Sequence, residues 1–286
     1  MELSKAKTGP ELIITLHETS EVKAKSSWIR LLVLGILAGA YIAFAAEAST
    51  MAAYNLLADP STYGVGRALT GAVFAAGLMF CVVAGAELFT GNTLMAGSVA
   101  VRKICFWSML RNWGIVYGAN FIGSILLVCM IASSGLWHSS GDLLGAMAIK
   151  IAAGKTALGF ESAFVLGIMC NWLVCLAVWM AWAAEGVGGK LAAVFFPIWL
   201  FVTSGFEHSI ANMYYIGAGL FAKEVPELAA KASEIGVSAD AMAGLSWQSF
   251  FVNNLVPVTL GNIVGGVLFV ALAYVFANSK WAKKSV

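Results

Sequence analysis

The sequence predicts an all-α protein that crosses a membrane six times, and three observations support this prediction. Of the 286 residues, 60% are apolar and only 11% are charged, whereas a soluble domain carries about a quarter charged residues. The apolar residues gather in runs long enough, at about 20 residues each, to cross a bilayer as helices. The sequence lacks the short segments of alternating hydrophobicity that are typical of membrane β-barrels.

Six apolar runs are predicted to span the membrane. They cover residues 28–57, 68–101, 112–135, 162–184, 191–222 and 247–277. The second run is interrupted by Glu87 and the fifth by Glu207. We therefore predict one transmembrane domain at 28–279, an N-terminal tail at 1–27 and a C-terminal tail at 280–286. Residues 1–27 hold four lysines and four glutamates and no apolar core, so we do not expect a signal peptide there.

The basic residues predict that both tails are cytoplasmic. With this orientation, twelve of the 17 lysines and arginines lie in cytoplasmic segments. The five on the opposite side are Arg67, Lys150, Lys155, Lys223 and Lys231. Cytoplasmic segments of membrane proteins are enriched in positive charge, and an even number of spans also places both termini on one side.

Three motifs of the first half recur in the second half in the same order. The pairs are Val33-Leu34-Gly35-Ile36 with Val165-Leu166-Gly167-Ile168, Gly85-x-Glu87-x4-Asn92 with Gly205-x-Glu207-x4-Asn212, and Asn120-x-x-Gly123 with Asn262-x-x-Gly265. Each pair joins one span to the third span after it. Because three is odd, the halves at about 28–135 and 160–279 enter the membrane from opposite sides. This inverted repeat is typical of transporters, whose site lies at the midplane between the halves.

Gly85 and Gly205 predict that the second and fifth helices are broken at mid-membrane. A break leaves backbone groups without partners. We expect Glu87 and Glu207 to accept hydrogen bonds from the freed amides, with Asn92 and Asn212 completing the motif at each break. The glutamates are then either purely structural or, in addition, part of the lining of a permeation pathway. In either case, irregular backbone at membrane depth indicates a cavity beside it.

His208 and Lys155 are the candidate functional groups. His208 is the histidine at membrane depth, and intramembrane ionisable groups are functional by default. It can donate a hydrogen bond or a proton, although a packed histidine at the break is the alternative. Lys155 lies in a stretch of small residues before the fourth span. Its ammonium group either lies over a pore mouth, where the positive charge concentrates anions, or reaches the lipid headgroups.

Polar and aromatic side chains accompany these two groups. Exposure of the polar side chains of Asn171 and Asn262 to lipid would cost free energy, so we expect both to face the protein interior. We expect the aromatic residues Phe74, Phe89 and Phe201 to flank these polar groups. Such aromatic residues are more often core than gate.

Four segments closely resemble the formate–nitrite transporter family, and the similarity spans all six predicted helices. The segments are Gly85-Ala86-Glu87-Leu88-Phe89-Thr90-Gly91, the stretch SGFEHSIANM at 204–213, CNWLVCLAVWM at 170–180 and NLVPVTLGN at 254–262. The resemblance implies an aquaporin-like protomer, a homopentamer and a location in the inner membrane of a prokaryote. It also implies passage of small monovalent anions of weak acids, namely formate first, then nitrite or hydrosulfide.

Site residues follow from this resemblance position by position. It assigns the central histidine to His208, the vestibule lysine to Lys155 and the loop threonine to Thr90. The pore asparagines are Asn171 and Asn262, and Glu207 is expected beside the pathway. The constriction residues are Leu78, Leu88, Phe89 and Phe201. Two segments, Gly91-Asn92-Thr93 and Cys170-Asn171-Trp172, look more like the nitrite-type members.

Other function classes have less support in the sequence. There is no His-Glu-x-x-His motif, phosphate-binding loop or paired Asn-Pro-Ala box, so we predict no enzyme, metal, cofactor or nucleic-acid partner. A hydrolase that pairs Ser204 or Ser209 with His208 is the enzymatic alternative, and a receptor is the structural one. The predicted partners are the lipid bilayer and a small anion.

Overall fold

The computed structural model describes residues 6–278, which contain helices and turns but no strand. Six helical segments are long and apolar enough to cross a membrane. They are α2 (Trp28–Ala58), α3 (Tyr63–Ala84), α6 (Phe106–Ser134), α8 (Phe160–Ala183), α9 (Gly186–Ser204) and Ser249–Ala277. The last segment consists of η2 (Ser249–Leu255), α13 (Val256–Gly266), η3 (Val267–Leu272) and α14 (Ala273–Ala277). The predicted fold class and span number are confirmed, and the predicted tail at 280–286 lies outside the described residues.

The two interrupted runs each divide into separate helices. The run at 68–101 continues after α3 as α4 (Phe89–Asn92) and α5 (Met95–Ala100), and the run at 191–222 continues after α9 as α10 (Ser209–Ala222). A further helix, α7 (Leu143–Thr156), packs against α10. The remaining elements are α1 (Gly9–Lys25), η1 (Leu136–His138), α11 (Pro226–Glu234) and α12 (Ala239–Gly244).

Glycines bring the long helices into close contact. α2 packs against α3 and α6, and α8 packs against α13. A Cβ atom on Gly39 would lie 2.1 Å from the carbonyl oxygen of Asn120 in α6, and one on Gly261 would lie 2.1 Å from that of Phe164 in α8. Small residues that allow such approach are typical of helix contacts in membranes.

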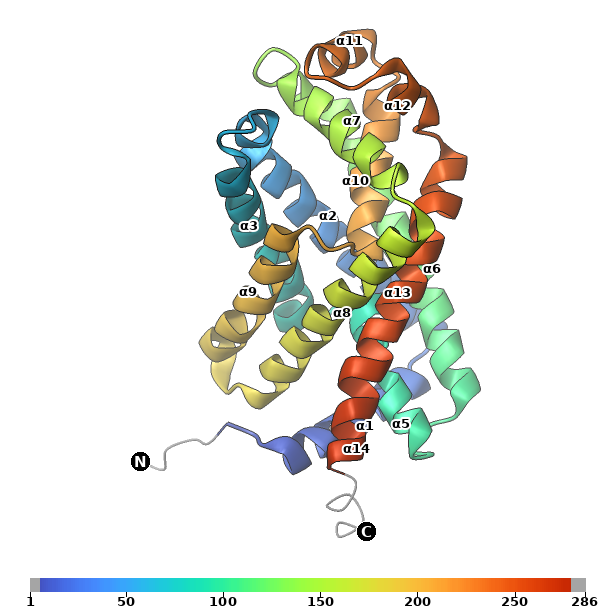
Figure 1. Cartoon of the computed structure of the whole chain (residues 1–286). Coiled ribbons are helices and arrows are strands. Elements are labelled where there is room, and N and C mark those ends of the chain that lie inside the picture. Colours follow the sequence, from blue (N-terminus) through green and yellow to red (C-terminus); the bar gives the residue numbers. More distant parts are fainter. Residues whose placement is uncertain (1–5, 279–286) are drawn as a thin grey trace.

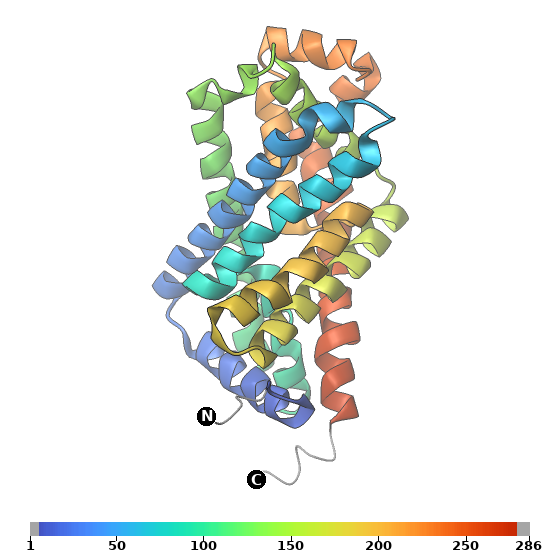
Figure 2. The same ribbon diagram turned by 90° about the vertical axis from the view of Figure 1, so that its left-hand side faces the viewer.

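Helix α1 lies across one end of the bundle, close to α5 and α14, whereas α11 and α12 cover the opposite end (Figures 1 and 2). We call the α1 end the lower side and the α11 end the upper side. Leu12, Ile13 and Leu16 are buried in one cluster with Leu94 and Val275. Residues expected only as a tail thus form a docked helix, because their few apolar side chains recur on one face.

The outside of the bundle is apolar. Phe44, Leu126 and Leu268 are among many large side chains with about half of their surface exposed, which suits contact with lipid rather than water. Glu47, the carboxylate within α2, is buried and accepts a hydrogen bond from Tyr214 of α10. It therefore faces the protein and not the surroundings.

Candidate functional site

The helical backbone stops at Gly85 after α3 and at Gly205 after α9. Both glycines have φ of 82°, in the left-handed region that glycine adopts at little cost. Residues 85–88 precede α4, and residues 205–208 precede α10. We call these segments the first gap and the second gap.

Asn262 of α13 holds the second gap in place. Its Oδ1 accepts from the backbone N–H of Ser209 at 2.9 Å, and its Nδ2 donates to the carbonyl of Glu207 at 3.0 Å and to that of Gly167 at 2.8 Å. The Glu207 N–H donates to the carbonyl of Leu166 in α8 at 3.3 Å. The irregular backbone is thus satisfied by neighbouring helices.

Asn120 of α6 holds the first gap in the same way. Its Oδ1 accepts from the N–H of Phe89 at 3.0 Å, and its Nδ2 donates to the carbonyls of Glu87 at 3.0 Å and Gly35 at 2.8 Å. The sequence suggested that the two glutamate carboxylates would accept from the freed amides. The structure differs, because an asparagine side chain offers both an acceptor and a donor and can bind a backbone N–H and two backbone carbonyls at once.

The carboxylate of Glu207 instead belongs to a polar cluster on the upper side. Its Oε1 lies 2.7 Å from the Nζ of Lys155, and its Oε2 accepts from the Nδ2 of Asn212 at 2.6 Å. The Nδ2 of Asn212 also lies 2.7 Å from the Oδ1 of Asn254, and Asn254 donates to the Lys155 carbonyl at 2.9 Å. The pair is mostly buried, and the remaining partners satisfy the charges, as a buried ion pair requires.

An equivalent cluster lies on the lower side around Glu87. Its Oε2 is 2.7 Å from the Nζ of Lys23 in α1 and accepts from the Nδ2 of Asn92 at 2.7 Å. Asn92 in turn donates to the Oδ1 of Asn112 at 2.8 Å. The sequence did not identify Lys23, because only the docking of α1 brings it to a residue in the second span.

His208 and Thr90 meet between the two clusters. The Nε2 of His208 lies 3.0 Å from the Thr90 Oγ1, and the Nδ1 of His208 accepts from the backbone N–H of Ala211 at 3.0 Å. Because Nδ1 accepts, the proton of a neutral imidazole is on Nε2 and points to Thr90. The ring of Phe201 stacks on the imidazole with 6.0 Å between centroids.

Asn171 lies behind Thr90 and contacts backbone. Its Nδ2 donates to the carbonyl of Asn262 at 2.6 Å, to the Oγ1 of Thr93 at 3.1 Å and to the Thr90 carbonyl at 3.2 Å. Asn171 and Asn262 are both fully buried, and their hydrogen bonds position the backbone of Thr90 and of the second gap.

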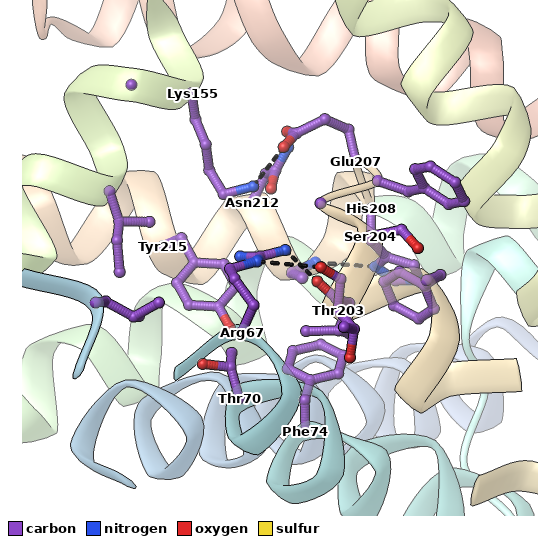
Figure 3. Close-up of a pocket in the computed structure, with 18 of the residues that line it drawn as sticks. Arg67, Thr70, Phe74, Lys155, Thr203, Ser204, Glu207, His208, Asn212 and Tyr215 are labelled. Atoms are coloured by element: carbon purple, nitrogen blue, oxygen red, sulfur yellow. Dashed lines mark hydrogen bonds and ion pairs between the residues drawn. The ribbon is translucent and has the colours of Figure 1, made fainter. Parts of the chain in front are cut away.

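Two cavities lie at the two gaps, and His208 lines the upper one. The upper cavity has a volume of about 480 Å³, and its lining includes Lys155, Glu207, His208, Phe74 and Phe201. Figure 3 shows Lys155 and Glu207 facing one another across it.

The lower cavity has a volume of about 460 Å³. Its lining includes Lys23, Glu87, Lys190, Leu78 and Leu88. None of the residues that line one cavity lines the other.

The predicted constriction residues therefore fall in three places. Phe201 borders the upper cavity, whereas Leu78 and Leu88 border the lower one. Phe89 lines neither cavity and packs edge-on against Trp113 and Tyr117. The predicted gap residues Gly205, Glu207 and Asn212 line the upper cavity, and Gly85, Glu87 and Asn92 line the lower one.

Comparison with known proteins shows which protein family this chain resembles. A family model described as formate/nitrite transporter matches residues 10–276. The probable formate transporter of Methanothermobacter thermautotrophicus is 36% identical over 275 residues, which are 91% of this chain and 93% of that protein. The formate channel FocA of Escherichia coli is 34% identical over 260 residues, which are 90% of each chain.

Two solved structures are also similar. A pentameric formate channel with formate bound is 37% identical, with a TM-score of 0.74, and the match covers 88% of this chain and 98% of that chain. An ion channel of the same family is 29% identical, with a TM-score of 0.77, and covers 93% of this chain and 98% of the other. Since the family model spans nearly the whole chain and the relatives match over about nine-tenths of it, this multi-pass membrane protein belongs to the formate/nitrite transporter family.

Proposed function

We propose that this protein is a channel or transporter for small monovalent anions of weak acids, with formate as its main substrate. The observation that carries the proposal is the route from the Lys155–Glu207 pair in the upper cavity to the His208–Thr90 pair. The names of the relatives support formate. The segment Gly91-Asn92-Thr93 resembles the nitrite-type members, so nitrite is the first alternative within the family, and hydrosulfide is the second. In this proposal the protein catalyses no covalent reaction and needs no cofactor.

The proposal includes the architecture that the sequence predicts. The channel domain at 28–279 is an inverted repeat with halves at about 28–135 and 160–279, whose broken helices meet at mid-membrane. The matched hydrogen bonds of Asn120 and Asn262 support this arrangement. The upper side faces outward and both termini face the cytoplasm, in agreement with the distribution of basic residues. The solved pentameric relative supports a homopentamer in the cell membrane.

In the first step, the positive charge of Lys155 attracts the anion into the upper cavity. An anion that leaves water for a narrow apolar passage loses its hydration, which costs several kcal/mol. The ammonium of Lys155 offsets part of this cost at the upper cavity, and Glu207 keeps the ammonium in position. The anion competes with that carboxylate for Lys155, so it is attracted without being trapped.

His208 then offers a hydrogen bond. In its neutral form the Nε2–H donates to Thr90, and the anion replaces Thr90 as acceptor when it passes. Transfer of a proton to the anion would instead require a charged imidazole, whose Nδ1 would have to release the N–H of Ala211. We therefore assign His208 the role of hydrogen-bond donor, and a proton relay is the competing mechanism.

Flux into proteoliposomes of the purified protein tests the proposal. Formate, nitrite and hydrosulfide should be compared at about pH 5 and about pH 7.5, on either side of the ordinary pKa of histidine. We expect formate to be carried fastest, and His208→Asn to reduce its flux at both pH values. Absence of anion flux from intact protein would refute the proposal. A flux in His208→Asn that loses only its pH dependence would favour the proton relay.

A further inference from the structure

Arg67 is a cation of the upper cavity that the proposed pathway does not use. It lies near the start of α3 and lines the cavity together with Lys155, Glu207 and His208. Of the other charged residues in the lining, Lys155 pairs with Glu207 at 2.7 Å, and Lys150 donates to the carbonyl of Ile235 at 2.9 Å. Within residues 6–278, no carboxylate pairs with Arg67. Its positive charge is therefore not neutralised by an anionic side chain.

One edge of the Arg67 guanidinium is fixed on the protein. Its Nε donates to the carbonyl of Thr203 at 3.4 Å, and its Nη2 donates to that of Val202. Both carbonyls belong to the last turn of α9, directly before Gly205. Figure 3 shows Arg67 reaching across the cavity to this turn. The negative end of a helix favours a cation, so the guanidinium is held in a defined orientation.

The other edge of the guanidinium is open. A guanidinium has five N–H groups in one plane, and two of them serve the carbonyls. Among the described residues, Nη1 has no hydrogen-bond partner. The open edge presents two parallel N–H groups, from Nη1 and Nη2. This spacing matches two oxygens on one planar anion.

We propose that the open edge of Arg67 is an anion subsite that selects planar monovalent anions with two oxygens, such as formate and nitrite. The subsite binds both oxygens before the anion moves on to Lys155 and His208. An anion with a single acceptor atom, such as chloride or hydrosulfide, cannot place two oxygens on the two parallel N–H groups. The inference rests on the proposed anion transport and deepens it, because it names a residue that distinguishes anions of equal charge.

The contact between α3 and α9 does not depend on Arg67. The Nε1 of Trp199 donates to the carbonyl of Ala68 at 2.8 Å, and a Cβ on Gly71 would lie 2.7 Å from the Trp199 carbonyl. Substitutions of Arg67 should therefore leave the fold in place. The lower cavity is lined by lysines and glutamates but no arginine, so the subsite acts on anions from the upper side alone.

Two variants separate the shape of the guanidinium from its charge. Arg67→Lys keeps the charge but not the parallel N–H groups, and Arg67→Gln removes both. The half-saturating concentration of labelled formate should be measured in vesicles of each orientation. We expect both variants to raise it roughly fivefold to tenfold from the upper side, with maximal flux and lower-side values unchanged. Lys223→Gln is the matched control, because the ammonium of Lys223 binds the carbonyl of Leu245 and lines neither cavity.

Each other result overturns the inference. If Arg67→Lys behaves as the unsubstituted protein while Arg67→Gln does not, charge alone is sufficient. If neither variant changes the half-saturation, Arg67 binds no anion in transit. If maximal flux falls equally from both sides, the residue is structural. Failure of the proposed function is distinct from all three, since the unsubstituted protein would then show no formate flux.

Discussion

Asn262→Leu should destabilise the protein because three buried backbone groups depend on the Asn262 side chain. These groups are the N–H of Ser209 and the carbonyls of Glu207 and Gly167, at 2.9, 3.0 and 2.8 Å. At about 0.6 kcal/mol for each hydrogen bond in a membrane protein, the loss is about 2 kcal/mol. If each group stays unsatisfied at about 1–3 kcal/mol, it reaches roughly 3–9 kcal/mol.

Thermal unfolding of the detergent-solubilised protein measures this loss. A change of 1 kcal/mol shifts the midpoint by about 2–4 °C in a protein of this size, so even the lower value predicts a drop of at least about 4 °C. Asn120→Leu is the matched variant in the first gap and should cause a similar drop. The exposed Asn55 provides the control Asn55→Leu, which should change little. A midpoint within about 2 °C of the unsubstituted protein for Asn262→Leu would refute the assignment of these bonds.

Three further predictions concern charge, hydroxyl and pH. Lys155→Ala should raise the half-saturating formate concentration from the upper side several-fold, since it removes the ammonium that attracts the anion; unchanged uptake kinetics would contradict this role. Thr90→Val keeps the shape of the side chain but leaves the buried Nε2–H of His208 without its partner, so flux should fall about tenfold, with a thermal shift smaller than that of Asn262→Leu. The pKa of His17 in α1 is lowered, because burial disfavours its charged form and Lys103 repels it. Docked α1 therefore binds fewer protons than released α1, and docking weakens as the pH falls below the ordinary pKa of about 6.5. Limited proteolysis of α1 should accelerate there, and His17→Gln should abolish that acceleration.

The fold could be predicted because the membrane limits the choices. Apolar runs of sufficient length must become helices, and the structure has the expected six. What the sequence did not predict was the docking of α1. The apolar face of α1 is short, and α1 docks against α5 and α14, which are remote from it in sequence.

The site could be predicted in part. Glycine and glutamate within apolar runs are conspicuous in the sequence, and α3 and α9 end at Gly85 and Gly205. Asn120, which holds the first gap, belongs to a motif that recurs in the sequence, but its hydrogen-bond partners depend on three-dimensional contacts between α6 and the first gap. The positions of Lys23 and Arg67 at the cavities could not be predicted from the sequence for a different reason. Basic residues near the ends of spans are common, so only the structure indicates that these two reach the cavities.

His208 provides the test that separates function from packing. Both gaps have a glycine, a glutamate and an asparagine that binds their backbone, but the position equivalent to His208 in the first gap is Leu88. The first gap therefore forms without a histidine, which argues that the fold does not require one in the second. His208→Leu removes the bonds to Thr90 and Ala211, and loss of such a helix cap costs about 1 kcal/mol. We expect a thermal shift clearly smaller than that of Asn262→Leu, together with loss of most formate flux. Equal destabilisation by the two variants, or intact flux in His208→Leu, would instead indicate a packed histidine.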